Sequence, residues 1–270
     1  MRLTVALGVV AVLVTVAVVG IKTWWDDGTL VARINPGCTA GDFQISTDQA
    51  VIAADLVSVV VSRGLPARAS TLLITAGIQE SKLRNIPSGA GDRDSVGVLQ
   101  QRPSQGWGTA AELSDPEVAA GRFLDAVVKV PGWETEPAAE VIQAVQISVD
   151  GSFYAEHEAE GRTLADALDG TTPAGMTCRF VAPTEVATAQ TVAGQVLAAL
   201  PVTQPVIEGN AVTVPGAGWT TAAWFVANAD RLGIETVGTA GRTWTRADGW
   251  GAPPAGQART TGVTATLATV

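Results

Sequence analysis

Two neighbouring segments, Ile78–Asn85 (IQESKLRN) and Gly91–Arg102 (GDRDSVGVLQQR), decide which fold this sequence is expected to adopt. The first contains Glu80 near the predicted end of an apolar helix. The second is a glycine-containing loop that carries carboxylate and amide side chains. A carboxyl group at the end of a buried helix, next to a polar loop, is the kind of site that cleaves glycosidic bonds.

Glu80 is predicted to be partly buried. It follows Leu73 and Ala76 on the apolar stripe of a helix predicted over Ala67–Leu83, by the i, i+3, i+4 spacing. Burial and the negative end of the helix dipole both disfavour a charged carboxylate, so both raise its pKa toward that of a general acid. The alternative is a surface residue in the last turn, paired with a cation such as Lys82.

The order and spacing of the motifs around Glu80 resemble those of one enzyme superfamily. Gln79-Glu80-Ser81 and Ser95–Gln100 are similar to the Glu-Ser and Gly-Leu-Met-Gln motifs of the lytic transglycosylases and goose-type lysozymes. Gly91–Ser95 and Gln100–Gly108 (QQRPSQGWG) look most like an actinobacterial, membrane-anchored branch of that superfamily. The resemblance covers roughly residues 45–178.

This resemblance implies a lysozyme-like helical fold in which Glu80 is the acid/base. The implied reaction cleaves the β-1,4 bond between N-acetylmuramic acid and N-acetylglucosamine in peptidoglycan. A lytic transglycosylase needs one carboxyl group, because the muramic acid 6-hydroxyl attacks within the substrate. Inverting hydrolysis by water needs a second carboxylate, for which Asp92 and Asp94 are the candidates. Both reactions stay open, with transglycosylation favoured; the two Asp could instead stabilise the turn.

Motif matches and position together predict a set of substrate-binding residues. They are Ser81, Ser95, Gln100, Gln101, Arg102, Trp107, Gln146 and Tyr154. For Gln101 and Arg102 the alternative is a solvated loop, and for Trp107 it is a place in the core. The superfamily's Ala-Tyr-Asn-Ala-Gly type motif is at best replaced by Ala144–Ser148, with Tyr154 downstream. An inactive protein that binds glycan or a partner at the cell surface is therefore the alternative function.

Helices are predicted through most of the rest of the chain, giving a mainly α fold with a small α+β unit at the end. Thr47–Arg63 begins at a Thr cap, and Ala67–Leu83 is stopped by Pro87. A helix capped by Ser114 and Glu117 runs to about Pro131. The remaining predicted helices are 137–148, 154–168, 185–200 and 219–232, and the predicted strands are 96–100, 235–239 and 262–268.

Four regions are expected: an anchor at 1–25, a lysozyme-like domain at 38–178, a helix and Pro-containing linker at 179–217, and a small domain at 218–270. The last contains Trp219, Trp224, Trp244 and Trp250. Tryptophan suits stacking against sugars or partner proteins, such as those of the cell wall or division machinery, although at least two of these four are expected to be core residues.

The N-terminal run Leu3–Ile21 contains nineteen mostly apolar residues, enough for a helix of about 28 Å that could span a bilayer. A single-pass protein of the cell membrane is therefore predicted, with its N-terminus in the cytoplasm and its bulk outside. A cleaved signal peptide is the alternative.

The only two cysteines, Cys38 and Cys178, are predicted to form a disulfide in an exported chain, with two buried thiols as the alternative. They and the single His are too scattered to form a metal site, and no cofactor is expected. A net charge of −9 argues against binding nucleic acid.

Overall fold

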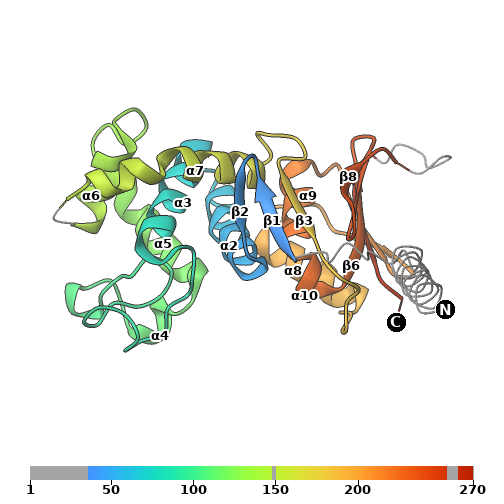
Figure 1. Cartoon of the computed structure of the whole chain (residues 1–270), viewed down its shortest axis with the longest axis horizontal. Helices are drawn as coiled ribbons and strands as arrows, with labels where there is room; N and C mark the ends of the chain where they lie inside the picture. Colours follow the sequence, from blue (N-terminus) through green and yellow to red (C-terminus); the bar gives the residue numbers. More distant parts are fainter. Residues whose placement is uncertain (1–35, 148–149, 254–260, 270) are drawn as a thin grey trace, which may run out of the picture. The chain divides into compact units, whose positions relative to one another are not determined.

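A computed structural model describes residues 36–147, 150–253 and 261–269 (Figure 1). These described residues are 44% helix and 19% strand, with two antiparallel sheets, so the fold is α+β. The predicted mainly α fold is therefore wrong. Most of the strands are only three to five residues long, which is too short for alternation of polar and apolar residues to reveal them.

A three-stranded sheet contains strands from both ends of the helical half: two of them precede its helices in the sequence, and the third follows them. It has the order β2-β1-β3, formed by β1 (Gly37–Ala40), β2 (Phe43–Ile45) and β3 (Met176–Arg179). The register pairs Cys38 directly with Cys178, and a disulfide joins them, which confirms the predicted pairing. The sheet and the disulfide thus fix the start and the end of residues 38–178 to each other.

The helices between these strands match the predicted ranges to within a few residues. Their bounds are α2 Thr47–Ser62, α3 Ala67–Ser81, α5 Pro116–Val127, α6 Ala138–Gln146 and α7 Ser152–Leu168. Two shorter elements, η1 (Pro103–Gln105) and α4 (Ala110–Leu113), were not predicted.

Two of the predicted caps are wrong by one residue. Ser46, rather than Thr47, caps α2 and forms a capping box with Gln49. Asp115, rather than Ser114, caps α5, because its carboxylate accepts hydrogen bonds from the backbone N–H groups of Glu117 and Val118.

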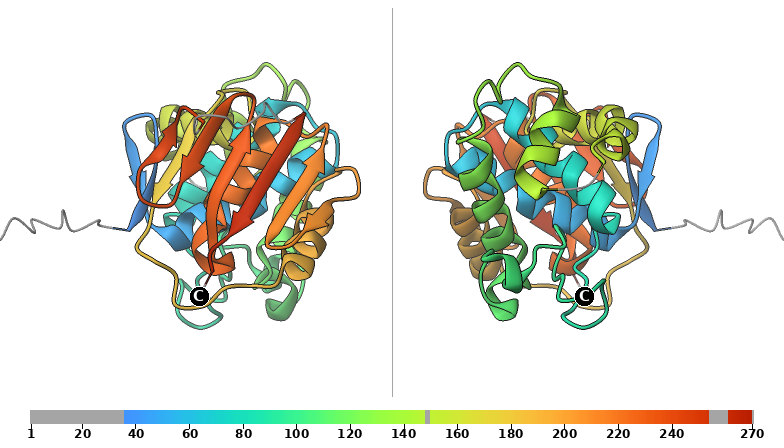
Figure 2. Two further views of the ribbon diagram at one scale, coloured as in Figure 1. Left: turned by 90° about the vertical axis from the view of Figure 1, so that its right-hand side faces the viewer. Right: turned by 90° about the vertical axis from the view of Figure 1, so that its left-hand side faces the viewer.

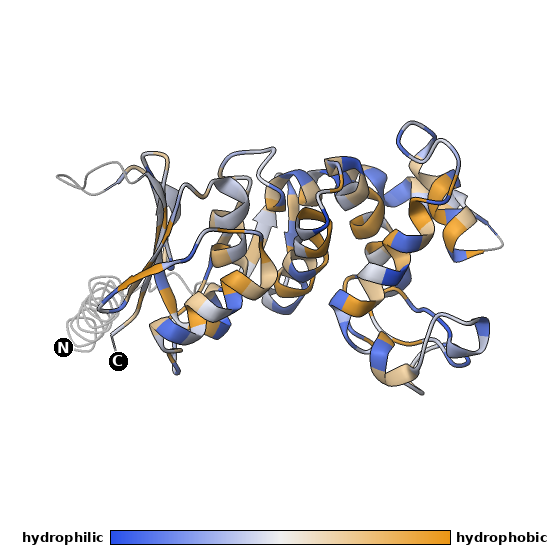
Figure 3. Ribbon diagram, turned by 180° about the vertical axis from the view of Figure 1, so that it is seen from behind, coloured by the Kyte–Doolittle hydropathy of each residue, from blue (hydrophilic) through white to orange (hydrophobic). Residues whose placement is uncertain are grey.

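The pair α3 and α7 forms the centre of the helical half, where the two helices lie side by side (Figure 1). Gly161 of α7 allows their close approach, since a Cβ atom there would lie 2.1 Å from Thr75 Oγ1 of α3. Residues 69–78 of α3 are all buried, so this helix is surrounded by the rest of the fold over most of its length. Figure 3 shows orange, hydrophobic segments among the helices of this half.

In its described part, the C-terminal half consists of a six-stranded antiparallel sheet and three helices. The sheet order is β4-β5-β9-β6-β7-β8, and Figure 2 (left) looks onto it with the helices behind. The strands are β4 Val206–Glu208, β5 Ala211–Pro215, β6 Ile234–Thr239, β7 Arg242–Thr245, β8 Gly249–Gly251 and β9 Gly262–Leu267; the helices are α8 Ala189–Ala199, α9 Trp219–Ala227 and α10 Ala229–Leu232.

Several details of this half differ from prediction, and β7 and β8 were not predicted at all. Residues 206–208 and 211–215, expected in a linker, are strands of the sheet. The helix predicted over 219–232 is divided at Asn228, whose buried side chain donates a hydrogen bond back to the Trp224 carbonyl group.

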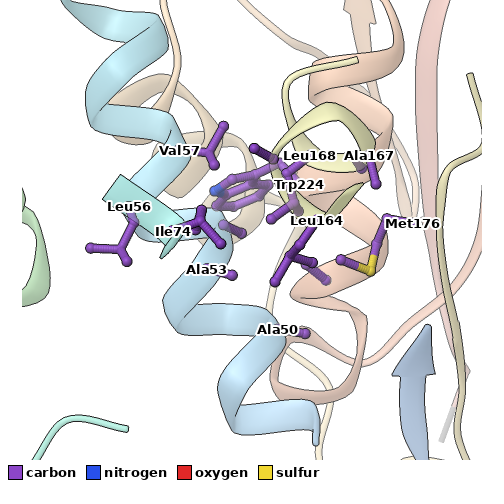
Figure 4. Close-up of a cluster of buried hydrophobic side chains, with 14 of the residues drawn as sticks. Ala50, Ala53, Leu56, Val57, Ile74, Leu164, Ala167, Leu168, Met176 and Trp224 are labelled. Carbon is purple, nitrogen blue, oxygen red and sulfur yellow. The ribbon is translucent and has the colours of Figure 1, made fainter. Parts of the chain in front are cut away.

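Trp224 is buried in the core that joins the two halves. Figure 4 shows it next to Val57 of α2 and Leu168 of α7. Trp244 is also fully buried, and its indole N–H donates to the Cys178 carbonyl group at 3.0 Å. Trp219 and Trp250 are half-buried and pack edge to face. Two of the four tryptophans are therefore core residues.

Arg246 joins several segments that follow β3, and its side chain is almost fully buried. The guanidinium group donates to the carbonyl oxygens of Val181, Ala229 and Ile234 and pairs with Asp230. These bonds satisfy a buried charge that would otherwise be costly.

The predicted anchor at residues 1–25 lies outside the described residues. Across residues 36–147, 150–253 and 261–269, no helix is both long enough and apolar enough to cross a bilayer. This finding contradicts the predicted single-pass membrane localisation.

Candidate active site

A cleft of about 480 Å³ lies at the C-terminal end of α3 and contains most of the predicted site residues. Nine of the eleven residues proposed for catalysis or binding line it: Glu80, Asp92, Ser95, Gln100, Gln101, Arg102, Trp107, Gln146 and Tyr154. Ser81 and Asp94 are not among the lining residues. Four lining residues were missed: Gln79, Arg93, Gln105 and Ile147. All four are close in sequence to predicted site residues, and this closeness is the feature of the sequence that could have identified them.

Two residues in left-handed conformations end α3 immediately after the site. Lys82 has φ of 57° and Leu83 has φ of 53°. Their backbone N–H groups donate to the carbonyls of Ile78 and Gly77, which closes the helix C-terminus. The helix therefore ends through its own cap, not through Pro87 as predicted, and Glu80 is left in its last turn.

Ser81 connects the end of α3 to the loop that follows. Its hydroxyl group donates to the Val98 carbonyl at 2.7 Å and accepts from the Arg84 N–H at 3.1 Å. Ser81 is buried, so its interactions hold the loop beside Glu80 and do not face the cleft.

The loop itself is a compact turn around Gly97, not the extended strand predicted over 96–100. Gly97 has φ of 78°, and its N–H donates to the Ile86 carbonyl group at 2.8 Å. A Cβ atom at this position would lie 2.2 Å from the Leu113 carbonyl oxygen. Only glycine fits this conformation and this space, and the turn directs Gln100 and Gln101 to the cleft.

The Glu80 carboxyl group is half-buried and is bound by a tyrosine from α7. The Tyr154 hydroxyl, which is almost fully buried, donates to Glu80 Oε1 at 2.6 Å. Burial raises the pKa of Glu80, and hydrogen bonds from Tyr154 and Gln146 offset part of that rise. The result is a carboxyl group that is held in place and retains its proton at higher pH than an ordinary glutamate.

Replacing Tyr154 with Phe is expected to raise the pKa of Glu80 further. The hydroxyl donates to the ionised carboxylate and favours it, so its loss leaves the effect of burial less opposed. Titration of the Glu80 side-chain carboxyl carbon by ¹³C NMR measures the change. An unchanged or lower midpoint in Tyr154→Phe would show that this hydrogen bond does not control the carboxyl group.

Asp94 is held within the loop. Its carboxylate accepts from the Ser104 N–H at 2.7 Å and pairs with Arg102 Nε at 2.9 Å. These bonds from Ser104 and Arg102 hold the pKa of Asp94 well below its usual range. Asp94 therefore stabilises the start of η1, and the Arg102 side chain is half-buried against it instead of being free in solvent.

Asp92 is the second carboxylate of the cleft lining, and it is strongly exposed. Its side chain is 88% accessible and lies 3.8 Å from that of Arg93. Such an exposed pair is a weak interaction. Asp92 is thus a solvated group at the rim, unlike Glu80.

The other wall of the cleft comes from the end of α6. Gln146 is its last residue, and Gln146 Nε2 donates to the Leu99 carbonyl at 2.9 Å. Ile147 follows in a left-handed conformation with most of its side chain exposed. Trp107 lines the cleft and also packs on the core. A position in the cleft and a place in the core, which were predicted as alternatives, therefore do not exclude each other.

Within the described residues, no group of three or more His, Cys, Asp or Glu side chains could hold a metal ion. Comparison of the sequence with protein-family models and with curated proteins gave no match.

Proposed function

We propose that this protein cleaves the β-1,4 glycan strand of peptidoglycan, with Glu80 as the acid/base. The observation that supports this most is the half-buried Glu80 carboxyl group, with its raised pKa and its hydrogen bond from Tyr154, in a cleft lined by amide side chains. The motif resemblance gives the reaction class, and the geometry is compatible with it.

Glu80 would act twice in this reaction. As the protonated acid it donates its proton to the glycosidic oxygen, and the bond from that oxygen to the anomeric carbon of muramic acid breaks. As the carboxylate it then takes the proton from the attacking hydroxyl group, which bonds to the same carbon. This restores the protonated Glu80.

We favour the muramic acid 6-hydroxyl over water as the attacking group. Activation of water needs a second carboxylate positioned as a base. Asp94 is engaged by Ser104 and Arg102, and Asp92 is exposed at the rim. Glu80 is therefore the one carboxyl group of the cleft lining in a partly buried environment.

Mass spectrometry of digested peptidoglycan tests this choice. The expected products are muropeptides lighter by one water than hydrolysis products, because intramolecular attack leaves a 1,6-anhydro end. Asp92→Asn is expected to give the same products at a rate within about threefold of wild type, since it removes only an exposed charge. Reducing ends of full mass, together with loss of activity in Asp92→Asn, would mean hydrolysis with Asp92 as the base.

A further inference from the structure

Gln101 has an unusual environment for a residue of a binding cleft. Its side chain is only 1% exposed, although it belongs to the cleft lining. Its backbone is fixed as well, because its carbonyl group accepts from the Val96 N–H at 3.0 Å. The position of the amide group is thus determined before any ligand arrives.

The direction of the Gln101 amide is determined by helix α5. Gln101 Nε2 donates to the Ala119 carbonyl oxygen at 3.2 Å. If the amide group were turned over, Gln101 Oε1 would face the Ala119 carbonyl oxygen, and two acceptors cannot form a hydrogen bond. Gln101 Oε1 must therefore point away from Ala119. Among the described residues, Gln101 Oε1 is buried and has no hydrogen-bond partner. A buried acceptor without a partner is unfavourable until a donor reaches it.

Two other amides of the cleft have their nitrogen atoms engaged in the same way. Gln100 Nε2 donates to the Gly97 carbonyl at 2.9 Å, and Gln146 Nε2 donates to the Leu99 carbonyl at 2.9 Å. The backbone therefore uses N–H groups of all three side chains. At Gln101 this leaves the amide oxygen as a buried acceptor without a partner among the described residues.

We propose that Gln101 Oε1 accepts a hydrogen bond from a donor on the bound sugar and thereby determines which glycans bind. The donor is an acetamido N–H or a hydroxyl group, which share this chemistry. The inference rests on the proposed function, because it takes the ligand to be a β-1,4 glycan.

Binding measured by calorimetry in a Glu80→Gln background tests the inference without turnover. The probes are the β-1,4 tetramers of N-acetylglucosamine and of glucose. Gln101→Met, which keeps the length of the side chain but removes the amide, is expected to weaken binding of the first tetramer by about 5- to 50-fold. Gln204→Met is the matched control: Gln204 is exposed and does not line the cleft, so the affinity of this variant for the tetramer is expected to stay within about twofold of the Glu80→Gln protein.

The two tetramers distinguish the sources of the donor. A loss of affinity that is confined to the N-acetylglucosamine tetramer identifies the acetamido N–H as the donor. An equal loss of affinity for both tetramers identifies a hydroxyl group as the donor. Unchanged affinity in Gln101→Met, or no binding of either tetramer to the Glu80→Gln protein, overturns the inference. Cleavage of peptidoglycan by the wild-type protein decides the proposed function separately.

A second measurement does not depend on the Gln101→Met variant being folded. In the Glu80→Gln protein, the ¹³C resonance of the Gln101 side-chain carbonyl is expected to shift when the N-acetylglucosamine tetramer saturates the site. A constant resonance at saturation also overturns the inference.

Discussion

Glu80→Gln is expected to lower the rate of peptidoglycan cleavage by about 10²- to 10⁴-fold, the range typical for loss of a general acid. The glutamine amide has nearly the same shape, and its oxygen can still accept the hydrogen bond from Tyr154. It cannot donate a proton to a glycosidic oxygen. Release of soluble muropeptides from isolated peptidoglycan measures the rate, and the thermal midpoint of unfolding is expected to change little.

Glu156→Gln is the matched control for this substitution. Glu156 lies on α7 near Tyr154, but it is exposed and does not line the cleft, so its variant is expected to cleave like wild type. Equal activity of Glu80→Gln and wild type would refute the proposed mechanism. If neither digests peptidoglycan but both sediment with it, the protein is a glycan-binding protein and not an enzyme.

Removing the disulfide is expected to have the largest effect on stability. The Cys38→Ser, Cys178→Ser double variant should lose roughly 2 to 5 kcal/mol of unfolding free energy, because a crosslink restricts the unfolded chain most when it closes a long loop. Here the two cysteines are 140 positions apart. The bonded residues are also buried in the three-stranded sheet, Cys38 on its central strand and Cys178 on β3, where serine hydroxyls would need new partners.

Urea unfolding followed by circular dichroism measures this loss. Wild-type protein unfolded with a reducing agent present is the control, and its stability should approach that of the double variant. Wild-type and variant proteins with equal midpoints in the absence of reductant would contradict the expectation.

The sequence predicted the helices well because each helix has local signals. The apolar spacing of each helix repeats every three or four residues, so it can be recognised locally. The ends were predicted less well, since Ser46 and Asp115 cap α2 and α5 and α3 ends at Lys82 without Pro87. The strands β1 and β3 lack such signals. They have four residues each, and β1 becomes a central strand only by pairing with residues far away in the chain. Their sheet could not be predicted locally, although the cysteine pair could.

The composition of the candidate site was predicted better than the interactions within it. The motifs around Glu80 identified most of the residues that line the cleft. They did not show that Asp94 is bound by Ser104 or that Tyr154 reaches Glu80 from α7. Asp92 and Asp94 are two positions apart and looked equivalent, but the fold leaves one exposed and engages the other.

Gly97 and Gly161, two of the glycines at which a Cβ atom would clash, also restrict how this protein can evolve. Gly97 faces the Leu113 carbonyl oxygen, a backbone atom that no substitution at Leu113 removes, whereas Gly161 faces the side chain and backbone of Thr75. A change at Gly161 could be accommodated only in part by a smaller residue at 75, and a change at Gly97 would require the chain around Leu113 to move. Any tolerated change at either glycine would therefore need a compensating change elsewhere in the chain.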